Sequence, residues 1–163
     1  MKLAIASGKG GTGKTTLATN MAVLCSSGSP KKPTVLADLD VEEPNSGIFL
    51  KGNRINQQQV MKQIPEWIED RCTFCNICKE TCNFNAIAVL PESVLIFPEL
   101  CHSCYACVGL CPEKALVMKD HEIGMLTHHK VNQLDFIEGK LNIGEQQAVP
   151  LISQTIKYAL DHF

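Results

Sequence analysis

The residues with the clearest chemical potential are cysteines. The chain has nine cysteines in 163 residues, and eight of them lie between positions 72 and 111. They form two runs with the same C-x2-C-x2-C-x3-C spacing, and each cysteine of the first run has a counterpart 29 residues later. This internal duplication indicates metal ligation, because thiolates are soft ligands for metals and metal clusters. The first run is Cys72, Cys75, Cys78 and Cys82, and the second is Cys101, Cys104, Cys107 and Cys111.

The spacing within each run suits a four-iron cluster. Three cysteines two residues apart can surround one cubane with a tight loop whose backbone N–H groups point toward the sulfurs, and the fourth cysteine follows the turn. The pattern resembles that of the bacterial two-cluster ferredoxins. One departure is that Asn83, instead of a proline such as Pro112, follows the last cysteine of the first run. The resemblance implies two [4Fe–4S] clusters with crossed ligand sets, one held by Cys72, Cys75, Cys78 and Cys111, the other by Cys82, Cys101, Cys104 and Cys107.

Zinc and disulfides are the alternative explanations for the cysteines. Zinc sites use two separated C-x2-C pairs rather than triplets, and zinc stays open as an alternative to iron. Disulfides need an oxidising compartment, and the N-terminal stretch MKLAIAS is too short for a signal peptide. The ninth cysteine, Cys25, follows the apolar stretch Leu17–Leu24, where we expect it to be a small buried hydrophobe.

A glycine-rich loop near the N-terminus is typical of phosphate binding. Residues 8–15 satisfy G-x-x-x-x-G-K-[ST] between an apolar run, Lys2–Ser7, that predicts a buried strand and a predicted helix over 16–24. Lys14 is expected to reach the β- and γ-phosphates and the Thr15 hydroxyl to ligate Mg²⁺, with ATP as the nucleotide. The predicted nucleotide-binding residues are Gly8, Lys9, Gly10, Gly11, Thr12, Gly13, Lys14, Thr15 and Thr16.

Two further features connect this loop to a known family. A second lysine, Lys9, lies near the start of the loop, and the predicted strand at 33–37 is followed by D-L-D-V-E-E-P-N at 38–45. These features resemble the MinD/ParA/Mrp/nitrogenase-iron-protein superfamily of P-loop ATPases. The resemblance implies that Lys9 contacts phosphate across a dimer interface, that Asp40 helps to position the attacking water, and that Asp38 and Thr15 lie at Mg²⁺. The expected catalytic residues are Lys9, Lys14 and Asp40.

The rest of the chain predicts that the cysteine-rich segment is an insert. A strand is expected over Ile123–Val131, and a helix with one apolar face over Leu151–Leu160. Between them, residues 136–150 resemble the family segment that returns the chain to the ATPase fold. The expected fold class is α/β: a partial P-loop NTPase parallel sheet with helices, made of residues 1–64 and 121–163, plus an inserted α+β ferredoxin-like 2[4Fe–4S] domain at 65–120.

A few residues outside these motifs give weaker signals. Gln57–Gln59 is expected to be a loop or the start of a helix, and Trp67 to pack at the entrance to the insert. His102 could bond a cluster sulfur, although a solvent-facing position is the simpler expectation. The pair His128–His129 has no neighbouring cysteine or carboxylate motif, so we expect it at the surface.

The amino-acid composition limits the classes of partner that the protein can bind. The chain has 15 Lys and Arg against 17 Asp and Glu, a net charge of −2, which gives no basic field for nucleic acid. The hydrophobic content of 45% excludes wholesale disorder. No stretch approaches the roughly 18–20 apolar residues of a transmembrane helix, and the helix at 151–160 is too poor in Lys and Arg for membrane targeting. We therefore expect a cytoplasmic protein without a nucleic-acid partner or stable membrane insertion.

One segment implied by the resemblance is missing. The family has a second catalytic strand that ends in a D-x-x-P-G-like turn, and residues 123–163 contain no such turn. We therefore expect an ATPase domain cut short before that strand, as a short protein, a split half or a fragment. The sequence leaves ATP hydrolysis open for the same reason.

Three functions fit these motifs. The first is an ATP-binding iron–sulfur protein that couples nucleotide binding or hydrolysis to electron transfer or iron–sulfur cluster delivery. The second is a simple 2[4Fe–4S] electron carrier with an inactive or incomplete ATPase part, and the third is a positioning or assembly ATPase of the MinD type. The expected cofactors are two [4Fe–4S] clusters, ATP and Mg²⁺. The expected partners are a redox partner or iron–sulfur acceptor protein, and a second chain in a homodimer or heterodimer across the nucleotide site.

Overall fold

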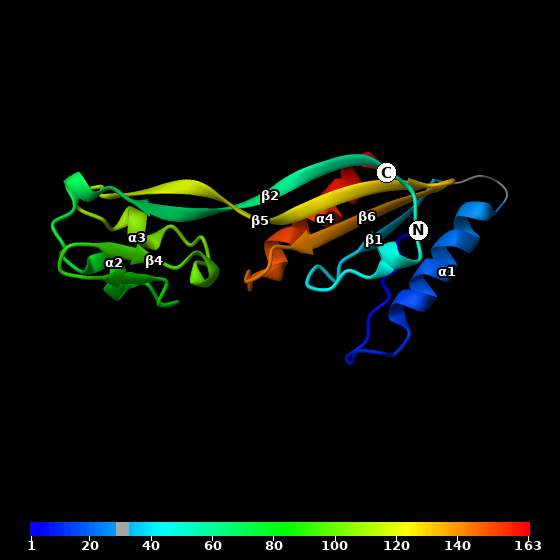
Figure 1. Ribbon diagram of the computed structural model, residues 1–163, viewed down its shortest axis with the longest axis horizontal. Helices are drawn as coiled ribbons and strands as arrows, with labels where there is room; N and C mark the ends of the chain where they lie inside the picture. Colours follow the sequence, from blue (N-terminus) through cyan, green and yellow to red (C-terminus); the bar gives the residue numbers. More distant parts are fainter. Residues whose placement is uncertain (29–32) are drawn as a thin grey trace. The chain divides into compact units, whose positions relative to one another are not determined.

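The computed structural model describes residues 1–28 and 33–163. The chain divides into two compact units (Figure 1). The first, here the P-loop unit, comprises residues 1–60, 124–141 and 148–163. The second, here the cysteine unit, comprises residues 61–123 and 142–147. The short segment 142–147 thus groups with the cysteines, although the sequence places it with the nucleotide-binding part.

A four-stranded sheet with the order β1-β6-β5-β2 supports the P-loop unit. Its strands are β1 (Thr34–Asp38), β2 (Asn53–Trp67), β5 (Leu116–Val131) and β6 (Leu134–Leu141). β1 pairs in parallel with β6, which places Asp38 opposite Glu138, and β5 pairs with β6 in antiparallel fashion. The long strands β2 and β5 contribute residues to both units. The mixed α/β architecture with a parallel strand pair agrees with the fold class expected of a P-loop domain.

Two predictions about strands are wrong. Gln57–Gln59 lies inside β2, because hydrogen bonding to β5 stabilises an extended backbone that the polar side chains do not predict. Residues 2–7 form no strand, and all of them except Ile5 are exposed. A strand needs a paired neighbour for its backbone N–H and C=O groups. In the part of the chain that the structure describes, nothing pairs with this run.

Two long helices belong to the P-loop unit. The helix α1 (Lys14–Ser27) follows the glycine-rich loop, and α4 (Ala148–His162) follows β6, so both predicted helices are confirmed. The apolar face predicted for α4 is only partly right. The buried residues of α4 are Leu151, Thr155 and Tyr158, whereas Ile156 and Leu160 are exposed.

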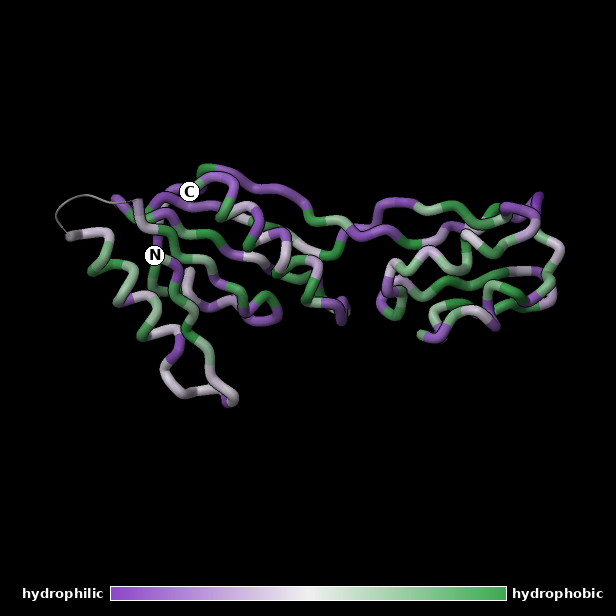
Figure 2. Tube along the Cα trace, turned by 180° about the vertical axis from the view of Figure 1, so that it is seen from behind, coloured by the Kyte–Doolittle hydropathy of each residue, from purple (hydrophilic) through white to green (hydrophobic). Residues whose placement is uncertain are grey.

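The helix α1 buries a face of small residues. Thr19, Ala22 and Ser26 are buried, and their spacing of three and four residues puts them on one side of the helix. Leu24 is 72% exposed and Cys25 is also exposed, so the predicted burial of Cys25 is wrong. In Figure 2 most of α1 is drawn in white to green, with few strongly hydrophilic residues along its length. The sequence therefore does not indicate which side meets the sheet.

The cysteine unit shows the internal duplication in its backbone. Residues with a left-handed backbone conformation (positive φ) recur 29 positions apart. The three pairs are Phe74 with Ser103, Asn76 with Tyr105, and Asn85 with Lys114. Each left-handed Asn76 or Tyr105 precedes a short helix, α2 (Ile77–Thr81) or α3 (Ala106–Gly109). The 3-10 turns η2 (Glu69–Arg71) and η3 (Pro98–Leu100) precede the two cysteine runs. A two-stranded sheet of β3 (Ile87–Val89) and β4 (Val94–Ile96) lies between the repeats.

Candidate functional site

The glycine-rich loop leads directly into the N-terminus of α1. Gly11 and Gly13 have φ of 71° and 87°, a left-handed conformation that favours glycine, and Gly13 is the residue before the first helical turn. Within the loop, the Ser7 hydroxyl donates to the carbonyl of Lys9 at 2.8 Å, and the Thr12 hydroxyl donates to Ser7 Oγ at 2.7 Å. The first turn of α1 has no acidic residue, so its free N–H groups and positive dipole end suit an anion such as phosphate.

The loop after β1 folds back onto α1. The Thr15 hydroxyl donates to Asn45 Oδ1 at 2.8 Å, which joins the predicted Mg²⁺ ligand to the D-x-D segment. The Asp38 carboxylate accepts the backbone N–H groups of Asp40 and Ser46, both at 3.1 Å, and so closes the loop. The structure therefore brings Thr15 and Asp38 to one corner of the unit. The motif alone predicts no role for Asn45, which lies in the same segment, 38–45.

The other predicted loop residues are placed differently. Lys14 is half-buried as the first residue of α1. Lys9 and Asp40 are both exposed. Gly8, Gly10, Thr12 and Thr16 are exposed along the loop and the first turn of the helix, where a nucleotide can reach them. The roles assigned to these residues stay predictions.

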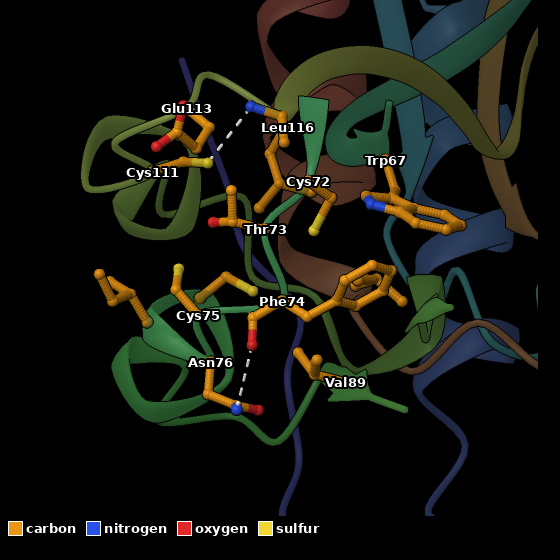
Figure 3. Close-up of a pocket in the computed structure, with 14 residues that line it drawn as sticks. Trp67, Cys72, Thr73, Phe74, Cys75, Asn76, Val89, Cys111, Glu113 and Leu116 are labelled. Carbon is orange, nitrogen blue, oxygen red and sulfur yellow. Dashed lines mark hydrogen bonds between the residues drawn. The ribbon is translucent and has the colours of Figure 1, made fainter. Parts of the chain in front are cut away.

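One pocket of the cysteine unit gathers Cys72, Cys75 and Cys78 from the first run with Cys111 from the second. Figure 3 shows the sulfur atoms of Cys72, Cys75 and Cys111 turned toward the same space. Apolar side chains, including Trp67 and Phe74, also line this pocket. The rings of Trp67 and Phe74 meet edge to face with their centroids 6.1 Å apart, which fixes the loop that carries the first cysteines.

A second pocket gathers Cys82 from the first run with Cys101, Cys104 and Cys107 from the second. Phe84 and His102 line it and stack on each other, with ring centroids 3.9 Å apart. His102 is solvent-exposed, in line with the simpler of the two expectations for it. Each pocket is therefore lined by three cysteines of one run and the last cysteine of the other, the grouping that the ferredoxin resemblance implies.

Backbone donors reach the sulfur of the last cysteine in each run. The N–H of Ala86 donates to Cys82 Sγ at 3.3 Å, and the N–H of Ala115 donates to Cys111 Sγ at 3.2 Å. A thiolate accepts such bonds more strongly than a neutral thiol does. The two equivalent bonds hold Cys82 and Cys111 where each lines the pocket of the other cysteine run.

Burial raises the pKa of two cysteine thiols. Burial raises the pKa of Cys107 from 9.0 to about 11, with a further contribution from the nearby Cys101 thiol. Burial also raises the pKa of Cys78, the equivalent residue of the first run. Metal ligation requires thiolates, so binding a metal here must release protons from these groups.

The donor set fits a metal cluster better than a single ion. Each pocket offers four thiols, the ligand number and type of a [4Fe–4S] cluster. Within the described residues, no three His, Cys, Asp or Glu side chains are placed to hold one metal ion. Four thiolates around a single zinc would all lie about 2.3 Å from that ion. In a four-iron cluster each thiolate binds a different iron, so the four sulfurs lie farther apart.

A buried polar network in the P-loop unit was missed from the sequence. His128 is only 6% exposed, and its ring nitrogens lie 3.0 Å from Asp135 Oδ1 and 3.2 Å from the Tyr158 hydroxyl. Lys130 Nζ donates to the other oxygen of Asp135 at 2.7 Å. The expected surface position is therefore wrong for His128, whereas His129 is partly exposed. Asp135 supplies the partner that the local sequence around the histidines lacks.

Comparisons with known proteins support the nucleotide-binding part most strongly. The family model of the CobQ/CobB/MinD/ParA nucleotide binding domain matches residues 3–156. Among the curated relatives, an uncharacterized protein of Methanocaldococcus jannaschii is 31% identical over 163 residues, 98% of this chain and 56% of its own length. A second uncharacterized protein of that organism is 38% identical over 90 residues, 53% of this chain and 30% of its own length. The chain thus spans about half the length, or less, of these relatives.

The cysteine-rich part has a smaller match of its own. Ferredoxin-1 of Chlorobaculum tepidum is 33% identical over 57 residues, which cover 31% of this chain and 92% of that ferredoxin. Across the described residues, none of the helices is long and apolar enough to cross a membrane.

Proposed function

The chain belongs to the CobQ/CobB/MinD/ParA nucleotide binding domain family, and on this basis we propose that it is a cytoplasmic ATP-binding iron–sulfur protein. In it, nucleotide binding would be coupled to electron transfer or to delivery of an iron–sulfur cluster. One observation carries the proposal: two pockets of the cysteine unit each collect four thiols, in a chain whose other unit has a complete phosphate-binding loop. The match to a ferredoxin over 57 residues supports the iron–sulfur half.

In the P-loop unit, the residues would bind ATP through its phosphates. The N–H groups around Gly13 and the first turn of α1 would donate to phosphate oxygens, and the Lys14 ammonium would neutralise the β- and γ-phosphates. Thr15 would turn its hydroxyl from Asn45 to Mg²⁺, while Asp38 holds the neighbouring loop through the N–H of Ser46. The exposed Lys9 would be available to the nucleotide of a second chain, which makes a homodimer or heterodimer part of the proposal.

In the cysteine unit, the two crossed cysteine sets would each hold one [4Fe–4S] cluster. Such clusters supply one-electron chemistry when bound. The described residues would set the protein side of that chemistry. The N–H groups of Ala86 and Ala115 would stabilise the thiolates of Cys82 and Cys111, and Trp67 and Phe74 would limit the access of water on one side of the first set.

A second candidate is an electron carrier that binds ATP without hydrolysing it. The match to Ferredoxin-1 over 92% of that ferredoxin's length favours this candidate, because it covers a whole ferredoxin without any nucleotide-binding part. The two candidate functions differ only in whether phosphate is released from ATP. Both would use a redox partner or an iron–sulfur acceptor protein.

The test is a single preparation assayed for metal and nucleotide. The protein is purified without oxygen, iron, sulfide and zinc are counted, and ATP binding and phosphate release are measured on the same sample. We expect about eight iron and eight sulfide per chain together with ATP binding. Phosphate release distinguishes the coupled ATPase from the carrier. Fewer than about four iron with bound zinc would overturn the iron–sulfur half, and no ATP binding would overturn the other.

A further inference from the structure

The segment Asn142–Gln147, here the strap, connects strand β6 to helix α4. Both flanking elements belong to the P-loop unit, but the strap belongs to the cysteine unit. Gly144 gives it a sharp turn, with φ of 93°. At its start, the N–H of Asn142 donates to the carbonyl of Ile123 at 2.9 Å. The strap is thus the one short segment whose neighbours in sequence and whose contacts in space belong to different units of the described chain.

An almost fully buried ion pair anchors the strap. Glu145 Oε2 accepts from Lys62 Nζ at 3.0 Å, and these side chains are 7% and 3% exposed. The other oxygen, Oε1, lies 2.7 Å from His121 Nε2. Burying two charges costs free energy, so such a pair marks a place where one arrangement is strongly selected and where losing one partner leaves the other charge unpaired.

The last residue of the strap holds the backbone of a predicted cluster ligand. Gln147 Nε2 donates to the carbonyl of Cys101 at 2.7 Å. Cys101 is 8% exposed and packs with the buried Ile64 and Ala86. The hydrogen bonds found for the strap in the described residues reach Cys101 of the second pocket and none of the cysteines of the first.

The residue just before the strap is tied to the D-x-D loop. The N–H of Leu141 donates to the carbonyl of Val41 at 2.8 Å, and Val41 is 1% exposed. Val41 directly follows Asp40, in the loop whose Asn45 accepts a hydrogen bond from Thr15. Movement of this loop when a nucleotide binds would therefore act on the backbone at the beginning of the strap.

We propose that the strap couples the D-x-D loop to the second cysteine set, with Gln147 as the positioning residue for Cys101. This proposal rests on the proposed function, because it needs both a nucleotide and clusters. Hydrogen bonds and burial around ligands set the reduction potential of an iron–sulfur cluster. ATP binding then shifts the potential of the cluster held by Cys82, Cys101, Cys104 and Cys107, and leaves that of the other cluster unchanged.

The test is a redox titration of the iron-loaded chain, followed by electron paramagnetic resonance, with and without ATP. Signals are assigned with Cys75→Ser and Cys104→Ser, a pair of exposed and equivalent cysteines from the two sets. Gln147→Met keeps the size of the side chain but removes the donor. Gln146→Met is the matched control, because Gln146 is the exposed neighbour. We expect ATP to shift only the second cluster in the wild type and in Gln146→Met, and the shift to disappear in Gln147→Met.

A second measurement uses the wild-type chain and so does not depend on how the variants fold. Hydrogen exchange of the iron-loaded protein is followed with and without ATP. We expect ATP to change the exchange of residues 99–103 and 142–147 and to leave residues 73–79 unchanged. A wild type that lacks iron or ATP binding overturns the proposed function itself. A wild type that has both, but shows no ATP-dependent change at 99–103 or in the second cluster, overturns the strap proposal alone.

Discussion

At the scale of single residues, polar side chains that bond to backbone groups organise both candidate sites. Asp38 holds the N–H of Ser46 at 3.1 Å, and Gln147 holds the carbonyl of Cys101 at 2.7 Å. A buried backbone group that loses its partner costs free energy, so such side chains fix a loop more firmly than their own exposure suggests. In the proposed function these residues would prepare a loop for a ligand, whereas the cysteines and the glycine-rich loop would make the direct contacts.

Replacing His128 by Leu is expected to lower the free energy of unfolding by about 1–3 kcal/mol, because a buried hydrogen-bond partner of Asp135 and Tyr158 is lost. The measurement is chemical denaturation. The neighbour His129 is the matched control, since its contact with Glu138 is longer, at 3.4 Å, and more exposed. His129→Leu is expected to cost less than about 1 kcal/mol. Equal losses for the two variants would contradict the assignment of His128 to a buried network.

Cys107 is expected to make the iron-free protein sensitive to alkaline pH. Its folded-state pKa of about 11 exceeds its ordinary value of 9.0 because the thiol is buried, so the folded chain binds the proton more tightly than the unfolded chain does. The stabilisation is complete below pH 9 and is lost as the pH rises toward 11. The melting temperature, measured under reducing conditions from pH 8 to pH 11, should therefore fall.

Two cysteine variants separate this effect from general alkaline unfolding. Cys107→Ala should show a shallower fall in melting temperature over the same range of pH, because the titrating thiol is gone. Cys25→Ala, at an exposed position outside both cysteine runs, should keep the fall of the wild-type chain. Parallel curves for the two variants would exclude Cys107 as the cause.

At the scale of elements, the sequence predicts best where a pattern is local. The glycine loop followed by α1, the strand at Thr34–Asp38 and the helix α4 all follow from short runs of residues. Strand pairing is not local, which is why Gln57–Gln59 in β2 was missed and why residues 2–7 form no strand. The burial of a side chain does not follow from the local sequence either. Leu17 and Leu24 are as apolar as core residues, but no described element covers them.

The contact between β6 and α4 depends on a residue without a side chain. A Cβ atom at Gly139 would lie 2.7 Å from Thr155 Oγ1 and 3.0 Å from Val41 Cγ1, both in fully buried residues. Gly139→Ala should therefore push α4 from the sheet and lower the free energy of unfolding by about 1–3 kcal/mol. Circular dichroism during denaturation measures this loss. Gly109→Ala, where no atom lies within 4 Å of the added carbon, should be nearly neutral, and equal effects would contradict the steric argument.

At the scale of the whole molecule, the two proposed binding activities would use separate sets of residues in one chain. The lining of the two pockets follows the division that the resemblance to two-cluster ferredoxins implies, whereas the repeat of 29 residues alone does not predict that Cys82 and Cys111 exchange pockets. The strap was not predictable in this way. Lys62, His121 and Glu145 are far apart in sequence, and only the fold brings them together. Contacts that could connect two binding sites are therefore harder to predict from a sequence than the binding motifs themselves.

The separate residue sets predict that each binding activity can be removed alone. Lys14→Ala takes away a charged hydrogen-bond donor to phosphate, which is worth about 1.5–3 kcal/mol, so ATP affinity should fall roughly 10- to 100-fold. Its iron content should stay at about eight per chain. Replacing Cys72, Cys75 and Cys78 together by Ser should lower the iron content to about four and leave ATP affinity unchanged.

Calorimetry with ATP and iron counts on the same preparations measure both quantities. Cys25→Ser is the matched control for the cysteine changes, because Cys25 is exposed and lies outside both pockets, and it should alter neither quantity. If Lys14→Ala also lost its iron, or if the triple cysteine variant also lost ATP binding, the two sites would depend on each other for folding. Coupling through the strap could then no longer be distinguished from a general loss of structure, whereas independent losses leave the strap as the specific connection between them.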